Sequence, residues 1–392
     1  MSVSASRLFR AVATLAVAAL VFAACGEEGG SGEDIPEEVS ADRESVMAEI
    51  DAIGEQAQSG ELEYDPSADS DETIEALREA IPAPDGYPSR AVEIIIGFGE
   101  GGGSDNYVRN IGPDSGRIMD TDIVYNNVPG ASGEVGMAQL TTAEPDGYTV
   151  ASVITNQVIN QAAGGQPYEF TDDFSFIIRQ QGPTEVYWVA EDSEWETFDD
   201  MLEYAADNPG EVRVSGSGRQ SDDEYRLLTL EDEIDSEFVY VPFDGVSERI
   251  QAILGGDIDV LHETAGTVYN LYEDGEIRPL AYGGDIVFDA IDPDIPSVAD
   301  LGYEVPTGRW RGMVGLPDTD PEILEYLHNV FYAASTLPHY TEYEEEFFQD
   351  VAGGYLGPED FQEASVEELG NIEQIIDELL GGEVDVEEDD ES

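Results

Sequence analysis

The stretch EIIIGFGEGGGSDNYV, residues 93–108, decides how the chain folds, because an apolar strand runs through glycines into a segment with helical pattern. Gly97, Gly99 and Gly102 have the G-x-G-x-x-G spacing of dinucleotide-binding loops, in the strand–turn–helix context that such loops need. The physics is more general, since glycines let the backbone approach any anion and a helix start offers free N–H groups. By itself the stretch fits a dinucleotide, a carboxylate, or a turn whose glycines only allow positive φ.

Short apolar strands and helical segments alternate from Tyr87 onward. AVEIIIGF, DIVYNNVPG and DGYTVASVI are typical strands, and helical segments separate them. This order indicates βαβ units and a parallel sheet. The rhythm repeats after Glu185, where Thr197 is the expected N-cap of a helix and EVRVSGSG ends in a second Gly/Ser loop. Two α/β halves, each with such a loop at a strand's carboxyl end, predict a ligand-binding cleft between them.

The charge balance is extreme. The chain of 392 residues has 88 Asp plus Glu against 15 Lys plus Arg, for a formal net charge of -73, and all of these cations are arginines. Carboxylates spread along the whole chain predict a surface that stays hydrated where salt screens self-repulsion, and so a halophilic or salt-tolerant source. Nucleic acid is excluded as a partner, because phosphate binding needs a basic surface.

The N-terminus has the layout of a lipoprotein signal peptide. Arg7 and Arg10 precede an uncharged apolar run over residues 11–24, which is short for a membrane span. Small residues then precede Cys25, the only cysteine, so no intrachain disulfide can form. We expect removal of residues 1–24, lipidation of Cys25, and a soluble domain tethered to the outer face of the cytoplasmic membrane.

The segment from residue 25 to 86 predicts an acidic tether followed by a helical extension. Residues 26–40 are rich in Gly, Ser and Glu, and helical patterns cover residues 41–60 and 71–80. These helices form either a stalk or a small cap, and we assign them no binding role. The last ten residues, 383–392, are a charge run that predicts a disordered tail.

Catalysis finds little support in the sequence. The three histidines, His262, His328 and His339, belong to no metal-binding or nucleophile motif. An exported hydrolase that uses two carboxylates stays an alternative. The dinucleotide hypothesis is weak, because Asn126 and Asn127 stand where an acidic residue would hold the ribose, and export takes NAD out of reach. We therefore expect no enzyme, no cofactor and no metal.

A carboxylate-binding cleft is the hypothesis that remains. Its first wall is the loop from Phe98 to Asp105, where N–H groups and the Ser104 hydroxyl converge. Asp105 itself repels a carboxylate, so we expect it to cap the helix start and fix the loop.

The second wall is SGSGRQSD, residues 215–222, again strand, loop and helix. Arg219 either pairs with a second ligand carboxylate in a bidentate fork or neutralises Asp222 or Asp223 at the surface. The first alternative predicts a dicarboxylate ligand.

Several motifs together resemble one family. They are YPSRAVEIIIGFGEGGGSD, NNVPGASGEVGMAQLTTAEPDGYTV, NPGEVRVSGSG, FVYVPFDGVSERIQAILGGDIDV, GEIRPLAY and IPSVADLGY. From about residue 87 to 380 the chain resembles the extracytoplasmic solute receptors of the tripartite tricarboxylate transporters, the Bug or TctC family. The resemblance implies a periplasmic-binding-protein-like Venus flytrap of two α/β domains, with mainly parallel sheets around a central cleft.

The implied domains are residues 87–187 with 309–382, and residues 188–308. We expect a monomer that closes on a small organic carboxylate and delivers it to membrane permease subunits. A receptor that senses ligand without transport is the alternative.

The resemblance also implies ligand-binding residues, carried over by position. They lie in the first loop, on the cleft floor, and in the second domain: Phe98, Gly102, Gly103, Ser104, Asp105, Thr155, Asn156, Ser215, Gly216, Ser217, Gly218, Phe243, Asp244, Glu263 and Thr264. For Phe243 and Trp310, core packing is the alternative. The chain departs from the family where Gly99 and Glu100 replace Ala and Pro. It departs again at Arg219, where a small residue is usual, and at the acidic pair 222–223, where a histidine is usual.

Overall fold

The computed structural model describes most of the chain beyond its N-terminal segment. The described residues are 37–182, 184–243, 245–283, 291–303, 308–350 and 353–380. The predicted signal peptide, Cys25 with its lipidation, Asp244 and the acidic tail lie outside these ranges. They stay predictions.

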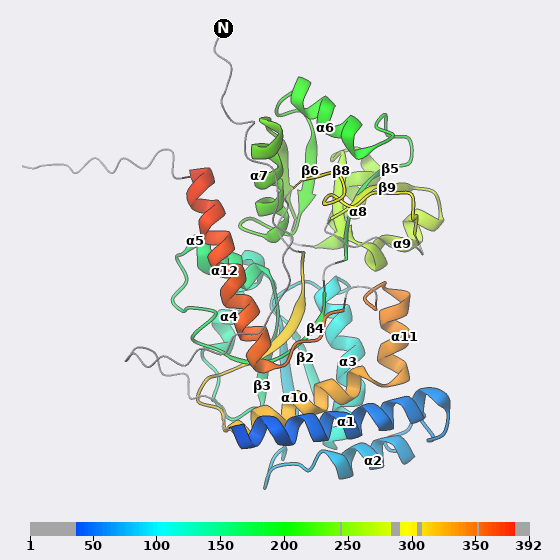
Figure 1. Cartoon of the computed structure of the whole chain (residues 1–392), viewed down its shortest axis with the longest axis vertical. Coiled ribbons are helices and arrows are strands. Elements are labelled where there is room, and N and C mark those ends of the chain that lie inside the picture. The colour runs from blue at the N-terminus through cyan, green and yellow to red at the C-terminus, as the bar shows by residue number, and fades with distance from the viewer. Residues whose placement is uncertain are drawn as a thin grey trace, which may run out of the picture. The chain divides into compact units, whose positions relative to one another are not determined.

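A five-stranded sheet forms the centre of what we call the first lobe (Figure 1). Its strands, in the spatial order β2-β1-β3-β10-β4, are Ile123–Asn127, Val92–Ile96, Thr149–Ile154, Arg311–Gly315 and Ser175–Gln181. β1 pairs in parallel with β2 and β3, whereas β10 is antiparallel to its neighbours β3 and β4. Four strands therefore share one direction, as the prediction of a mainly parallel sheet requires.

The second lobe repeats this pattern. Its strands, in the spatial order β7-β6-β8-β5-β9, are Val239–Pro242, Arg213–Gly216, Val260–Thr264, Glu185–Ala190 and Ile277–Tyr282. β6 is parallel to β7 and β8, and β5 is antiparallel to β8 and β9. The two-domain α/β class is thus confirmed. The exact domain bounds stay a prediction, and a boundary after residue 187 would divide β5.

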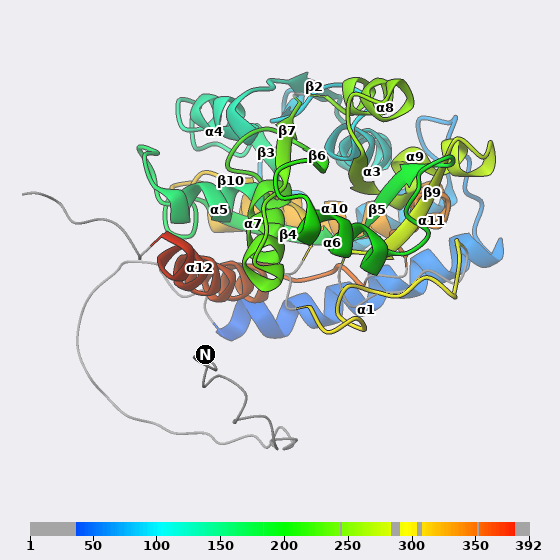
Figure 2. The same cartoon turned by 90° about the horizontal axis from the view of Figure 1, so that it is seen from above.

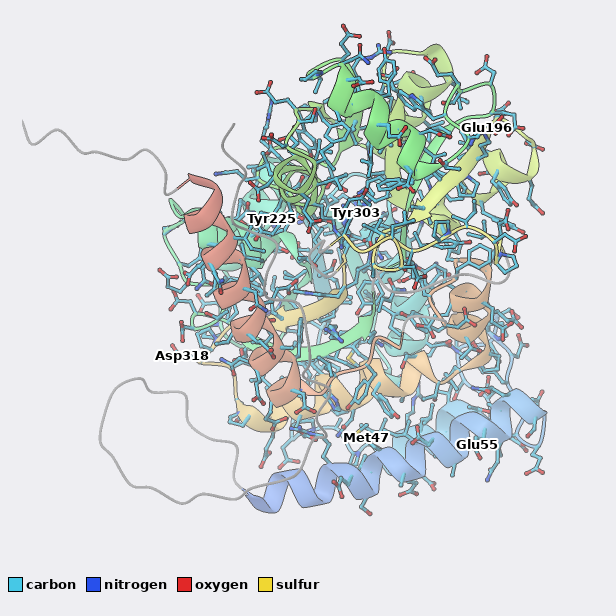
Figure 3. All side chains as sticks on the ribbon, turned by 45° about the horizontal axis from the view of Figure 1, so that its top comes forward. Met47, Glu55, Glu196, Tyr225, Tyr303 and Asp318 are labelled. Carbon is cyan, nitrogen blue, oxygen red and sulfur yellow. The ribbon has the colours of Figure 1, made fainter. Side chains whose placement is uncertain are left out.

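Helices bury both faces of each sheet. In the first lobe α3 and α10 pack on one face and α4, α5 and α12 on the other. In the second lobe α6 and α7 cover one face, and α8 and α9 the other. Figure 2 shows α12 running beside α5 and α7. The bounds, from α3 to α12, are Gly103–Met119, Glu134–Leu140, Asn156–Ala163, Phe198–Asp207, Asp222–Ile234, Val246–Gly255, Ala265–Glu273, Pro321–Ser335, Pro338–Glu346 and Pro358–Leu380.

Local capping signals start the helices of the second lobe. Thr197 is the N-cap of α6, as predicted: its side chain accepts the N–H of Asp200, whose carboxylate accepts the N–H of Thr197. Ser221 caps α7 by accepting the N–H of Glu224. The start of α7 thereby becomes a defined place directly after the second Gly/Ser loop.

The N-terminal extension is part of the folded body. Its helices are α1, Glu37–Ser59, and α2, Glu72–Ala80, and α1 lies alongside α10 in Figure 1. Ile50 and Ile74 are fully buried in the same apolar cluster as side chains of α3 and α10. Arg43 of α1 pairs with Glu325 of α10 at 2.6 Å. These contacts place α1 and α2 against the first lobe, the arrangement that the cap alternative describes.

Candidate functional site

The first Gly-rich loop joins β1 to α3 and is held by an acidic side chain. Gly102 is the N-cap residue of α3 and makes no side-chain cap. The Asp105 carboxylate reaches back one turn: Oδ2 accepts the N–H of Gly101 at 2.8 Å, while Oδ1 accepts from Arg109 Nε at 2.8 Å and Asn127 Nδ2 at 2.9 Å. Asp105 therefore fixes the loop. The first N–H groups of α3 have no partner within the helix, as at any helix start.

Arg311, at the start of β10, lies against this loop and was missed by our sequence reasoning. It is buried, and a Cβ built on Gly103 would lie 2.2 Å from its Nη2 atom. Its Nη1 donates to Gln181 Oε1 at 3.3 Å, and its Nε has no hydrogen-bond partner. The available signal was the motif GRWRG, residues 308–312, which holds two of only 15 cations in the chain.

The hydrogen-bond donors of the second Gly/Ser loop bind carboxylates of the helix that follows it. The N–H and hydroxyl of Ser217 both donate to Asp223 Oδ2 at 2.7 Å, and the N–H of Gln220 donates to Glu224 Oε2 at 2.7 Å. The carbonyl of Gly218 accepts the Tyr240 hydroxyl at 2.6 Å. Just before this loop, in β6, Ser215 is fully buried and its Oγ has no partner among the described residues.

Arg219 lies at the surface. Its side chain is 65% exposed and pairs with Glu224. Neither Asp222 nor Asp223, the two partners expected for a surface arginine, is bound by it. This placement offers no support for a second ligand carboxylate on Arg219, because an ion pair at an exposed position contributes little free energy.

The cation that pairs with the acidic start of α7 is Arg309. Its Nη2 lies 2.8 Å from Asp222 Oδ1 and 2.9 Å from Asp223 Oδ2, and all three side chains are buried. His262 Nδ1 adds a contact of 2.6 Å to Asp223 Oδ1. Arg309 lies two residues before β10, so it joins the returning chain to the second lobe.

The pKa values of the neighbouring carboxyls of Asp222 and Asp223 shift in opposite directions. Burial raises the pKa of Asp222, and Arg309 offsets this only in part. Burial would also raise the pKa of Asp223, but Arg309 and the hydrogen bond to His262 hold it well below its usual range. Asp222 Oδ2 has no hydrogen-bond partner. The cluster is thus a buried ion network with one unsatisfied carboxyl oxygen.

Thr155 and Asn156, predicted for the cleft floor, join the lobes. Asn156 Oδ1 accepts the N–H of Asp222 at 3.1 Å, and its Nδ2 has no partner although the residue is fully buried. Thr155 Oγ1 donates to the Gly308 carbonyl at 3.2 Å and accepts the Trp310 N–H at 3.3 Å. Both residues therefore sit where the chain of one lobe meets the other.

The remaining predicted residues have internal partners. Phe243 packs at the edge of an apolar cluster in the second lobe, and its N–H donates to the Gly216 carbonyl at 3.0 Å. Glu263 pairs with Arg249 at 2.7 Å and accepts from Thr264. Trp310 packs on Phe361 and donates to Glu368, which favours the core alternative for this residue. Phe98 is half-buried, and Ser104 is buried at the start of α3.

No other feature of the described residues competes with this site. None of the described helices is long and apolar enough to cross a membrane. Within the same ranges, no group of three or more His, Cys, Asp or Glu side chains is arranged to hold a metal ion. A groove of about 550 Å³ lies beside α7, near Tyr225, Leu228 and Ile376. Its rim carries four carboxylates and neither Gly/Ser loop, so we do not assign the ligand to it.

Comparison with known proteins identifies the family. Residues 108–380 match the family described as "Tripartite tricarboxylate transporter family receptor". The "UPF0065 protein in gbd 5'region" of Cupriavidus necator is 27% identical over 295 residues, which cover 75% of this chain and 89% of the relative.

Two solved structures support this match. A TctC solute-binding protein from Polaromonas is 25% identical with a TM-score of 0.58, over 74% of this chain and 99% of that one. A Rhodopseudomonas palustris protein solved with adipate is 20% identical with a TM-score of 0.67, over 75% of this chain and 98% of that one, and it supports the fold alone.

These proteins are extracytoplasmic solute receptors rather than enzymes, so the hydrolase alternative is set aside. Because the family match covers well over half of its residues, the chain belongs to the tripartite tricarboxylate transporter family of receptors.

Proposed function

We propose that this receptor captures a small organic carboxylate, dicarboxylates included, by closure of its two lobes. It then delivers the ligand to the membrane permease subunits of a tripartite tricarboxylate-type transporter. The receptor works as a monomer, held at the outer face of the cytoplasmic membrane by lipid on Cys25. The binding step is a hinge closure without chemistry.

One observation carries the proposal: buried polar atoms without partners come from both lobes. Asn156 Nδ2 belongs to the first lobe and Ser215 Oγ to the second, and both residues are fully buried. A buried donor without a partner costs about 1–3 kcal/mol. A polar ligand between the lobes relieves this cost, so closure and ligand binding stabilise each other.

The chemistry of the first loop supports a carboxylate. The start of α3 supplies N–H groups and the positive end of a helix dipole. The Asp105 carboxylate is bound to the N–H of Gly101 and holds the loop. The adipate in the Rhodopseudomonas palustris protein of the same fold is a ligand of this chemical class. We therefore expect carboxylates to bind in preference to sugars, nucleotides or cations.

Thermal unfolding of the mature chain in molar KCl tests the proposal, with hexanoate, malate, adipate and citrate as probes. A ligand that binds only the folded state raises the melting temperature by on the order of 5 °C at about 100 times its Kd. Asn156→Ala should remove this shift. Asn160→Ala is the matched control, because Asn160 is equally buried but pairs with Glu134 at 2.7 Å. No shift with any of the four acids would contradict the proposal.

An uptake experiment in cells distinguishes transport from sensing. We expect deletion of the receptor to abolish uptake of the bound carboxylate by cells that carry the permease subunits. Normal uptake together with a lost transcriptional response would support the sensing alternative instead.

A further inference from the structure

Among the residues that the structure describes, Arg311 is a buried cation without a counter-ion. Only 2% of its surface is exposed, and no described carboxylate lies within 4.0 Å of its guanidinium. Arg226, another buried arginine with no described carboxylate within 4.0 Å, donates to the backbone carbonyl of Gly283 and leaves Nε and Nη2 without partners. Unlike Arg311, it lies in the field of Asp222. Arg311 has a single hydrogen bond, of 3.3 Å, to the neutral amide of Gln181. Burying a charge without a partner costs several kcal/mol, and a bound anion would offset this cost.

The position of this guanidinium strengthens the case. Its Nη2 atom occupies the space beside Gly103, the first residue of α3, where any Cβ would collide with it. A helix start carries about half a positive charge, so the dipole and the arginine repel each other. An anion bound beside this pair, in contact with both, relieves the repulsion. Gly103 is partly exposed, so a ligand from outside can reach the start of α3 beside the guanidinium.

A second unsatisfied group lies on the same face of the sheet. Ser152 of β3 is buried and its Oγ has no partner. It stands opposite Met313 of β10, and residues two apart on a strand share a face, so Ser152 and Arg311 project to the same side, toward α3. The candidate anion site therefore combines the Arg311 guanidinium, the Ser152 hydroxyl and the first turn of α3.

Among its described residues, the second lobe offers no equivalent anion site. The donors of Ser217 and Gln220 are taken by Asp223 and Glu224, and Arg309 is paired with Asp222 and Asp223. We infer that Arg311, with the first turn of α3, holds the ligand's carboxylate in the first lobe alone. This inference rests on the proposed function. It implies that one carboxylate is sufficient for recognition and that the ligand docks on the first lobe before the second closes over it.

Isothermal titration of the mature chain tests this assignment, with whichever of hexanoate, malate, adipate and citrate stabilises the wild type most. We expect Arg311→Gln to bind that acid at least about thirtyfold more weakly, since truncating one partner of a buried charge pair costs 2 kcal/mol or more. Arg311→Lys keeps the charge and should recover part of the loss. Arg219→Gln, at the exposed arginine, should bind like the wild type.

A glycine pair keeps the test valid if Arg311→Gln does not fold. Gly103→Ala places a methyl group where the guanidinium now lies, so it should weaken the same acid at least tenfold. Gly370→Ala is its control, because Gly370 is exposed in α12, outside both Gly/Ser loops, and nothing lies within 4 Å of its Cβ. It should bind within about twofold of the wild type.

The outcomes separate the two proposals. If the wild type binds none of the four acids, the proposed function fails and this inference with it. If the wild type binds an acid and Arg311→Gln binds it equally well, the proposed function stands and the assignment of Arg311 is overturned. Equal weakening by Gly370→Ala and Gly103→Ala would also overturn it, because a general loss of folded protein would then explain both. If only Arg219→Gln loses affinity for the acid, the second Gly/Ser loop and not Arg311 binds the carboxylate.

Discussion

Ser132 and Arg219 connect the two lobes: the Ser132 hydroxyl donates a hydrogen bond of 2.5 Å to the backbone carbonyl of Arg219. Ser132 has a φ of 55°, in the left-handed region, and the neighbouring Ala131 has a φ of 48°. Left-handed conformations are unfavourable for residues with a Cβ, so this turn is strained. The strained turn presents its hydroxyl to the second Gly/Ser loop, directly beside Gly218.

We expect Ser132→Gly to speed ligand release about fivefold, because it removes one cross-lobe hydrogen bond, of about 1 kcal/mol, from the closed state. Stopped-flow measurement of the dissociation rate checks this. Ala131→Gly is the control, since it relaxes the same turn without touching the hydrogen bond. If both variants release ligand equally fast, backbone relaxation and not the hydroxyl governs opening.

Replacing Arg309 should be costly. Arg309→Met leaves the buried carboxyls of Asp222 and Asp223 without their cation, and breaking such a pair costs about 3–5 kcal/mol in the free energy of unfolding. Urea unfolding at constant salt measures this loss. Arg213→Met, which breaks a half-exposed pair with Asp259, should cost about 1 kcal/mol or less. Similar losses in the two variants would show that the buried cluster contributes no more than a surface pair.

Glu344 should make stability depend on pH. Burial, with the nearby Asp350, raises the pKa of Glu344 to about 8 from an ordinary 4.5. Between these values the folded chain holds a proton that the unfolded chain has lost. The free energy of unfolding from this residue therefore falls as pH rises from 4.5 to 8, by about 1 kcal/mol per pH unit or less.

Urea unfolding at several pH values, in constant salt, tests this slope. Glu344→Gln should flatten it, whereas Glu345→Gln, at the exposed neighbouring position, should leave it unchanged. An unchanged slope in Glu344→Gln would assign the pH dependence to other groups.

The N-terminal extension should contribute to global stability. Ile74 of α2 is fully buried against the first lobe, so Ile74→Ala should reduce the free energy of unfolding by about 2–5 kcal/mol. Val366→Ala, at a valine that is 50% exposed, should change it by about 0.5 kcal/mol or less. A cooperative loss in a single transition is expected. A separate early transition would show that α1 and α2 unfold independently of the lobes.

Much of the fold follows from local pattern. The apolar run before Gly97 predicts β1, the alternation with helices predicts two α/β sheets, and Thr197 predicts the start of α6. These features depend on periodicity, capping chemistry and glycine's freedom, which act within a few residues along the chain. The same local signals place both Gly/Ser loops at the carboxyl ends of strands.

Hydrogen-bond and ion partners were decided only by tertiary structure. With 88 carboxylates in the chain, no local pattern tells which of them meets a given arginine. The sequence therefore left Arg219 either as the ligand's cation or as a surface arginine, whereas folding places it at the surface and brings Arg309 and Arg311 inside.

What the sequence by itself determined is the order of strands, turns and helices, because that order rests on short-range sterics and on the alternation of apolar residues. What only the tertiary structure decided is which charges are buried, which of them find a partner, and that Arg311 does not. These outcomes depend on distances between segments more than a hundred residues apart, such as Gly103 and Arg311, and desolvation then sets the energetic cost of each.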